Sequence, residues 1–173
     1  MLKVLQTSGV THYLHPFNGF IEQWEFAKTK CSGDYIFGLC PDELPSPHLL
    51  LTLRDFLKDG KTDAIQIPKI NLYVDATKEK VSTMYTGNRP QSFLLQEHIN
   101  ADGWHCWPDY QMRVSRNVDK IKRIDGTHGP LGGCEIIKWM PENPMYAILH
   151  IKTVAHQERI LKTYDKLLAE GKQ

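Results

Sequence analysis

Residues 32–43 read Ser-Gly-Asp-Tyr-Ile-Phe-Gly-Leu-Cys-Pro-Asp-Glu, and the fold that we predict is built around them. A Gly-Asp turn leads into the apolar, β-prone run of residues 35–40, which is typical of a buried strand. This run ends in two adjacent carboxylates, Asp42 and Glu43. Open α/β sheets bind ligands at the carboxyl ends of their strands, and carboxylate oxygens suit Mg²⁺ or Mn²⁺. The alternative is an ordinary strand followed by a polar turn, since Asp, Glu and Pro commonly end strands.

Periodic apolar residues predict three helices. In residues 20–31 the apolar positions recur at intervals of three and four, which predicts one buried face. A second helix is expected to begin at Ser46 and Pro47, because Ser is a favoured N-cap and Pro a favoured first helical residue. Residues 154–169 carry an apolar stripe and predict the last helix.

Alternating apolar residues predict the strands. Residues 63–75 alternate around Pro68, which indicates either one strand with a bulge or a pair of bent strands. Residues 109–116 predict a strand with residues 121–124 as its hairpin partner. Two further strands are expected at residues 135–139 and 145–151. The mixed order of helices and strands predicts one domain over residues 1–173, a three-layer α/β sandwich with a mixed sheet.

Composition excludes several classes of protein. The chain has 173 residues, of which 41% are hydrophobic and 24% charged, as is usual for a globular domain. Its formal net charge of +1, without a basic stripe, argues against nucleic acid as a partner. No apolar run reaches the ~20 residues of a membrane span, and the first residues do not resemble a signal peptide, so we expect a cytoplasmic protein. The four cysteines show no CxxC or CxxH spacing and are expected to be buried free thiols.

Three stretches, taken in order, resemble glycosyltransferase family 2. Residues 18–43 contain Gly-Phe, Gln-Trp, Gly-Asp-Tyr-Ile and Asp-Glu, similar to the family's helix, strand and Asp-x-Asp segment. Residues 103–114, with Trp-Pro-Asp-Tyr-Gln-Met-Arg-Val, resemble a motif of the branch that includes lipopolysaccharide-core sugar transferases. Residues 128–133, with His-Gly-Pro-Leu, are similar to the family's His-Glu-x-Leu. The resemblance implies a GT-A type fold shortened at its N-terminus, because relatives carry two earlier strands.

The resemblance implies a metal-dependent glycosyltransferase that moves a sugar from a nucleotide-sugar donor to a hydroxyl acceptor, and inversion at the anomeric carbon is expected. Asp42 is then expected to bind Mn²⁺ or Mg²⁺, with His128 reaching the metal or the phosphates and Glu43 contacting the donor. Cys40 stands where the family has the first Asp of Asp-x-Asp, and a thiol is a poor ligand for a hard cation. Without the resemblance, His128 would be interpreted as a loop histidine bonded to backbone.

The resemblance also implies a catalytic base. Inversion needs a carboxylate to take the proton of the acceptor hydroxyl, and Asp109 is the expected residue. The alternative is that Asp109 closes a turn after Pro108. Arg113 would share a face with Asp109 and could pair with it or with phosphate.

Trp104 and Trp107 are candidates for sugar binding, because exposed aromatic faces beside polar groups commonly hold sugars, although a tryptophan is more often part of a core. The alternative function is a binding module for nucleotide-sugar or glycan without turnover. An exposed sheet edge in place of the missing strands predicts a possible homodimer.

Overall fold

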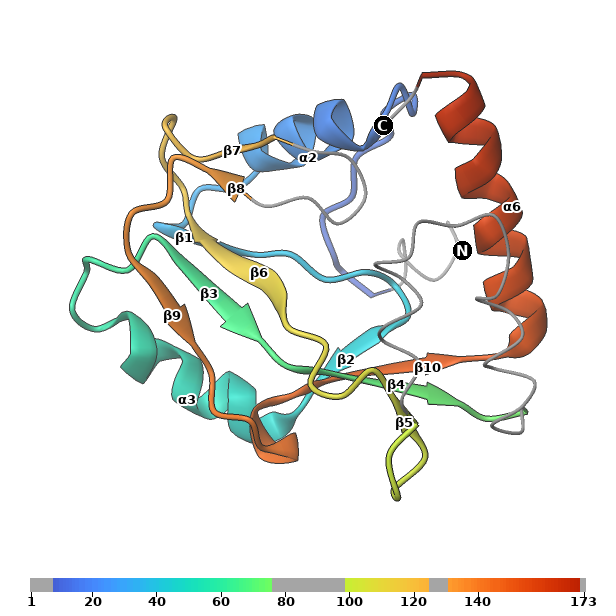
Figure 1. Ribbon diagram of the computed structural model, residues 1–173. Helices are drawn as coiled ribbons and strands as arrows, with labels where there is room; N and C mark the ends of the chain where they lie inside the picture. Colours follow the sequence, from blue (N-terminus) through green and yellow to red (C-terminus); the bar gives the residue numbers. More distant parts are fainter. Residues whose placement is uncertain (1–7, 76–98, 125–130, 172–173) are drawn as a thin grey trace.

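The structure is a computed structural model that describes residues 8–75, 99–124 and 131–171. This part of the chain is mixed α/β, with three α-helices, two four-stranded sheets and one two-stranded sheet (Figure 1). Both four-stranded sheets combine parallel and antiparallel neighbours. The sequence predicted the mixed α/β class correctly, whereas it suggested a single mixed sheet.

The first sheet has the strand order β1-β6-β3-β9. Its strands are β1 (Tyr35–Phe37), β6 (Gln111–Arg116), β3 (Ala64–Ile67) and β9 (Ile137–Trp139). The second sheet has the order β2-β10-β4-β5. Its strands are β2 (Glu43–Pro45), β10 (Ile148–Lys152), β4 (Lys69–Tyr73) and β5 (Trp104–His105). The remaining pair is β7 (Lys122–Arg123) with β8 (Leu131–Gly132).

Pro68 connects the two large sheets. It separates β3 from β4, which confirms the prediction of two bent strands in residues 63–75. Proline has no N–H to donate to a ladder, so a continuous strand is interrupted there. The Pro68 carbonyl accepts a hydrogen bond from the Ile148 amide at 2.9 Å, at the start of β10. The chain therefore passes from the centre of one sheet to the centre of the other within one residue.

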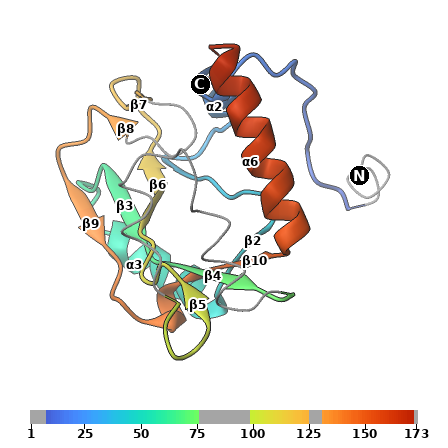
Figure 2. The same cartoon turned by 45° about the vertical axis from the view of Figure 1, so that its right-hand side comes forward.

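The helices follow the predicted segments, with one difference in burial. α3 (Pro47–Leu57) begins as expected: the Ser46 hydroxyl accepts a hydrogen bond from the Leu49 amide at 3.1 Å. α6 (Val154–Ala169) has the predicted bounds. α2 (Phe20–Thr29) ends two residues early and contains no fully buried residue, so its predicted buried face is wrong. Figure 2 shows α6 running from the end of β10 towards α2, where Phe20 and Tyr164 meet edge to face at 5.9 Å between ring centroids.

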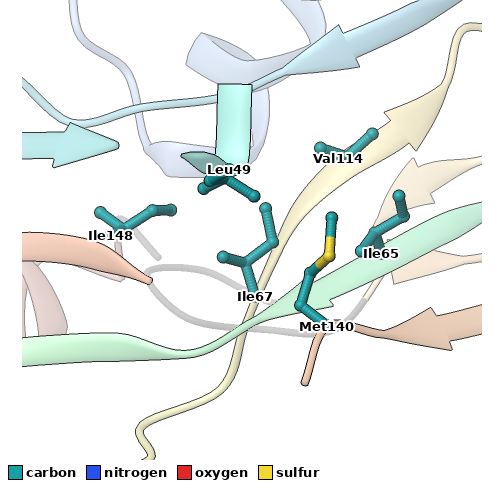
Figure 3. Packing of buried hydrophobic residues seen from close by; sticks show 6 residues of the cluster. All are labelled: Leu49, Ile65, Ile67, Val114, Met140 and Ile148. Atoms are coloured by element: carbon teal, nitrogen blue, oxygen red, sulfur yellow. The ribbon is translucent and has the colours of Figure 1, made fainter. Parts of the chain in front are cut away.

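The hydrophobic core lies between α3 and the two sheets. Its six residues are each at most 1% exposed: Leu49, Ile65, Ile67, Val114, Met140 and Ile148. Figure 3 shows Leu49 of α3 pointing towards Ile67 and Ile148, which come from different sheets. Burying six such side chains stabilises the fold by about 1.5–3 kcal/mol each. The core thus joins the sheets on the side that α3 covers.

Two strand predictions are wrong. The strand expected over residues 35–40 stops at Phe37, and the chain turns before β2, where the Glu43 amide donates to the Cys40 carbonyl at 3.0 Å. Residues 121–124 do not pair with β6. The reason is that β1 and β3 already occupy both edges of β6.

The cysteines are free, as predicted, but their predicted burial is wrong. Cys31 and Cys40 are exposed, and the other two are of intermediate exposure. Among the described residues, no helix is long and apolar enough to cross a membrane.

Candidate functional site

A row of polar residues crosses the second sheet. Glu43 of β2 pairs in register with His150 of β10, His150 with Asn71 of β4, and Asn71 with His105 of β5. Residues paired directly across strands share a face of the sheet. All four are buried, with 5–8% exposure. Buried polar groups are costly unless they are hydrogen-bonded, so the partners of this row define the site.

Asp109 lies beside this row and accepts hydrogen bonds from three side chains. Asn71 Nδ2 donates to Oδ2 at 2.8 Å, Gln111 Nε2 donates to Oδ1 at 2.6 Å, and Lys69 Nζ lies 3.0 Å from Oδ2. Burial alone would raise the pKa of Asp109, but the charge of Lys69 and the amide hydrogen bonds lower it. Asp109 is therefore held as a carboxylate. Because a carboxylate can accept about four hydrogen bonds, one acceptor position remains.

Glu43 and Arg113 form a buried ion pair. Arg113 Nη2 donates to Glu43 Oε1, and the Cys40 amide donates to Oε2 of the same carboxylate at 3.0 Å. The Glu43 side chain is 0% exposed and that of Arg113 is 12% exposed. The sequence suggested Asp109 or phosphate as the partner of Arg113, and the structure pairs it with Glu43. Arg113 Nε is buried and has no hydrogen-bond acceptor among residues 8–75, 99–124 and 131–171.

Asp42, His150 and Asn71 form a chain of contacts. His150 Nε2 lies 2.9 Å from Asp42 Oδ2, and His150 Nδ1 lies 3.0 Å from Asn71 Oδ1. Asn71 Nδ2 donates to Asp109 and to the His105 carbonyl, which fixes the orientation of its amide. Asn71 Oδ1 must then accept, so His150 Nδ1 carries a proton. A neutral His150 would consequently direct the lone pair of Nε2 at the Asp42 carboxylate.

The contact between His150 Nε2 and Asp42 Oδ2 is favourable when a proton or a metal ion lies between the two atoms. Burial, followed by the charge of Lys152, lowers the pKa of His150 to about 4. Burial alone would raise the pKa of Asp42, but its hydrogen bond with His150 and the charge of His150 lower it. The 2.9 Å between Oδ2 and Nε2 is also close to the edge of an octahedron with metal–ligand distances of about 2.1 Å. Asp42 and His150 thus fit two neighbouring positions around a small divalent cation.

Of the two metal ligands predicted from the sequence, Asp42 is among the residues that the structure describes. His128, the second predicted ligand, lies outside the described residues. No group of three or more His, Cys, Asp or Glu within the described ranges could hold a metal ion. A cation at Asp42 and His150 would therefore need other ligands. Mg²⁺ commonly completes its shell with waters and substrate phosphates.

The two tryptophans do not join the polar row. Trp104 precedes His105 in β5, and successive side chains of a strand point to opposite faces. The rings of Trp104 and Trp107 meet edge to face, with centroids 5.1 Å apart. The structure therefore links Asp42 to Asp109 and Glu43 to Arg113, and the register of Glu43 with His150 places these two groups side by side. The aromatic pair lies elsewhere, on β5 and the following loop.

Four further polar residues near these two groups were not predicted as site residues. Lys69, Asn71, His150 and Lys152 are polar residues at alternate positions of two otherwise apolar strands. A charged or amide side chain at every second position of an apolar strand indicates a polar face, and this signal was present in the sequence.

Comparisons with protein-family models, with curated proteins and with solved structures found no match to this chain. What the site does must therefore be argued from its own geometry.

Proposed function

We propose that the protein is a metal-dependent glycosyltransferase that uses a nucleotide-sugar donor and a hydroxyl acceptor, with a GT-A type, three-layer fold. The observation that supports this most is the convergence of its predicted residues. Asp42 and Glu43 come from one stretch of sequence, and Asp109 and Arg113 come from another about 70 residues later. Asp42 is linked to Asp109 through His150 and Asn71. Glu43 and Arg113 form a separate pair beside this chain, because Glu43 pairs in register with His150.

In this proposal Asp42 and His150 hold Mn²⁺ or Mg²⁺. The metal, when bound, supplies positive charge that stabilises the leaving nucleoside diphosphate. The chain's own residues position the remaining groups. Asn71 fixes the His150 ring through Nδ1, and Glu43 fixes Arg113. This second pair limits the rotation of the guanidinium, so Arg113 is preorganised to receive an anionic ligand.

Asp109 is the proposed base. In the inverting reaction, the acceptor oxygen forms a bond to the anomeric carbon while the bond from that carbon to the diphosphate breaks, and Asp109 accepts the hydroxyl proton. Lys69 keeps Asp109 ionised and ready to accept. The lowered pKa also makes Asp109 a weak base, which suits a step in which the proton leaves late, as the acceptor oxygen becomes positively charged.

The test is release of nucleoside diphosphate from a panel of uridine and guanosine diphosphate sugars, with and without Mn²⁺. Metal-dependent release is expected from the wild-type protein and should fall at least 100-fold in Asp42→Asn and in Asp109→Asn. Asp55→Asn is the matched control, because Asp55 is an exposed carboxylate on α3. Binding of a donor without any release would support the alternative of a binding module. Neither binding nor release from any donor would refute both.

A further inference from the structure

Lys152 lies close to the candidate site but was not predicted from the sequence. It is the last residue of β10, two positions after His150, so strand alternation places both side chains on the same face. Its partner in the parallel register is Tyr73 of β4, which is buried, whereas Lys152 itself is partly exposed. Lys152 is therefore directed to the same side of the sheet as the polar row.

The Lys152 ammonium has an incomplete set of partners. Nζ donates to Gln157 Oε1 at 2.9 Å, and Gln157, in the first turn of α6, is 5% exposed. An ammonium carries three N–H donors. None of the carboxylates in the described ranges forms an ion pair with Lys152. By contrast, Lys69, Lys120 and Lys138 each form an ion pair with a carboxylate.

The charge of Lys152 acts on the Asp42 carboxylate, so Lys152 lies within electrostatic range of the proposed metal ligand.

Arg113 Nε gives a second, independent observation. Within the described residues it is a buried donor without an acceptor, and the same guanidinium bonds to Glu43, the residue after Asp42. Two basic side chains beside Asp42 and Glu43 thus hold N–H groups that have no acceptor in the part of the chain that the structure describes. Buried donors are rarely left unsatisfied, and phosphate oxygens are strong acceptors for ammonium and guanidinium groups.

We propose that Lys152 is the anchoring cation for a diphosphate group bound at this site. The assignment rests on the proposed function and identifies the part of the donor that this residue recognises. Gln157 holds the ammonium in place, and the diphosphate oxygens supply the acceptors and the negative charge that it lacks. A lysine suits this task because its charge is compact and its three donors can rotate to meet the oxygens.

The test is calorimetric titration of the whole chain with inorganic pyrophosphate and with uridine diphosphate, each in the presence of Mg²⁺. Lys152→Met is expected to bind pyrophosphate at least tenfold more weakly, or about 1.4 kcal/mol. Lys152→Arg, which keeps the charge, should recover part of this loss. Lys166→Met is the matched control, because Lys166 lies on α6 with a 76% exposed side chain, and its affinity should equal that of the wild type.

A stability measurement separates ligand binding from a structural role. If Lys152 serves the ligand, Lys152→Met should unfold at the same or a higher urea concentration without ligand, since an unpaired, partly buried charge has been removed. Pyrophosphate should then stabilise the wild type more than this variant. A variant that loses stability but binds pyrophosphate normally would overturn the proposal, as would a wild-type protein that binds no pyrophosphate.

The outcomes also distinguish this inference from the proposed function. Lys152-dependent pyrophosphate binding without release of nucleoside diphosphate from any sugar donor would refute the transferase and leave the Lys152 assignment standing. Sugar transfer by the wild type, together with unchanged pyrophosphate affinity in Lys152→Met, would support the transferase and refute the Lys152 assignment.

Discussion

Replacing Lys69 by Met tests how the buried site is held together. Lys69 is 5% exposed in its side chain and lies 3.0 Å from Asp109, whose side chain is 22% exposed. Removing one partner of a buried ion pair commonly costs about 3–5 kcal/mol, because the other charge stays buried. Asp109 would keep its hydrogen bonds from Asn71 and Gln111. We therefore expect Lys69→Met to lower the free energy of unfolding by about 2–3 kcal/mol.

Urea unfolding followed by circular dichroism at pH 7 measures this loss. Lys58→Met is the matched control, since Lys58 pairs with Asp55 on the surface of α3 and both side chains are mostly exposed. It should change stability by less than about 0.5 kcal/mol. Adding Asp109→Asn to Lys69→Met should restore part of the loss, because no buried charge is then left unpaired.

The dependence on pH provides a second check. Lys69 lowers the pKa of Asp109. This contribution to stability is fully present above the ordinary aspartate pKa of about 3.9 and is lost as the pH falls through the lower pKa of the folded state. The difference between wild type and Lys69→Met should therefore be smaller at pH 3 than at pH 7. If Lys69→Met and Lys58→Met lost the same free energy of unfolding at pH 7, the buried Lys69–Asp109 pair would not stabilise the fold as we expect.

Three further predictions concern other parts of the fold. Ser46→Ala should cost about 1 kcal/mol in urea unfolding, because the hydroxyl caps α3, and an unchanged midpoint would contradict this role. Ile148→Ala should lower the free energy of unfolding by about 2–5 kcal/mol and Ile148→Val by about 1 kcal/mol, since this core side chain is 0% exposed. Equal losses for the two variants would indicate that the surrounding core relaxes to fill the cavity. His105 has a pKa lowered to about 4 by burial and then by the charge of Lys152, so the unfolded state binds more protons between pH 6.5 and 4 and stability falls as the pH drops. His105→Gln should make that fall shallower, and an identical pH profile would argue against the assignment.

Local signals in the sequence predicted the parts of the fold that depend on neighbouring residues. Ser46 and Pro47 marked the start of α3, and Pro68 marked the break between β3 and β4, because capping and the missing proline N–H act within a few residues. The predicted hairpin of residues 121–124 with β6 failed for the opposite reason. Pairing depends on which edges are free, and β6 is flanked by strands distant in sequence.

In the candidate site, too, the identities of the residues could be predicted from local sequence, but their partners could not. Asp42, Glu43, Asp109 and Arg113 were singled out from the sequence, and the structure links Asp42 to Asp109 and Glu43 to Arg113. That Arg113 would bond to Glu43 could not be deduced, since the residues are 70 positions apart and meet only after β6 and β2 are placed. The linking residues on β4 and β10 carried a weaker signal, alternation within short strands, which indicates a polar face but names no partner.

Because Pro68 joins a core strand to a strand of the candidate site, a change in chain length there would affect both the core and the site. Ile65 and Ile67 on one side of it belong to the core, while Lys69 and Asn71 on the other side hold the polar groups. A binding site carried on loops can be exchanged while the scaffold stays intact. Here an insertion or deletion of one residue near Pro68 would reverse the facing of one strand relative to the other, exposing core side chains or turning the polar row away. Specificity in this protein should therefore evolve through residues at the rim of the second sheet, while the length of the β3–β4 segment stays fixed.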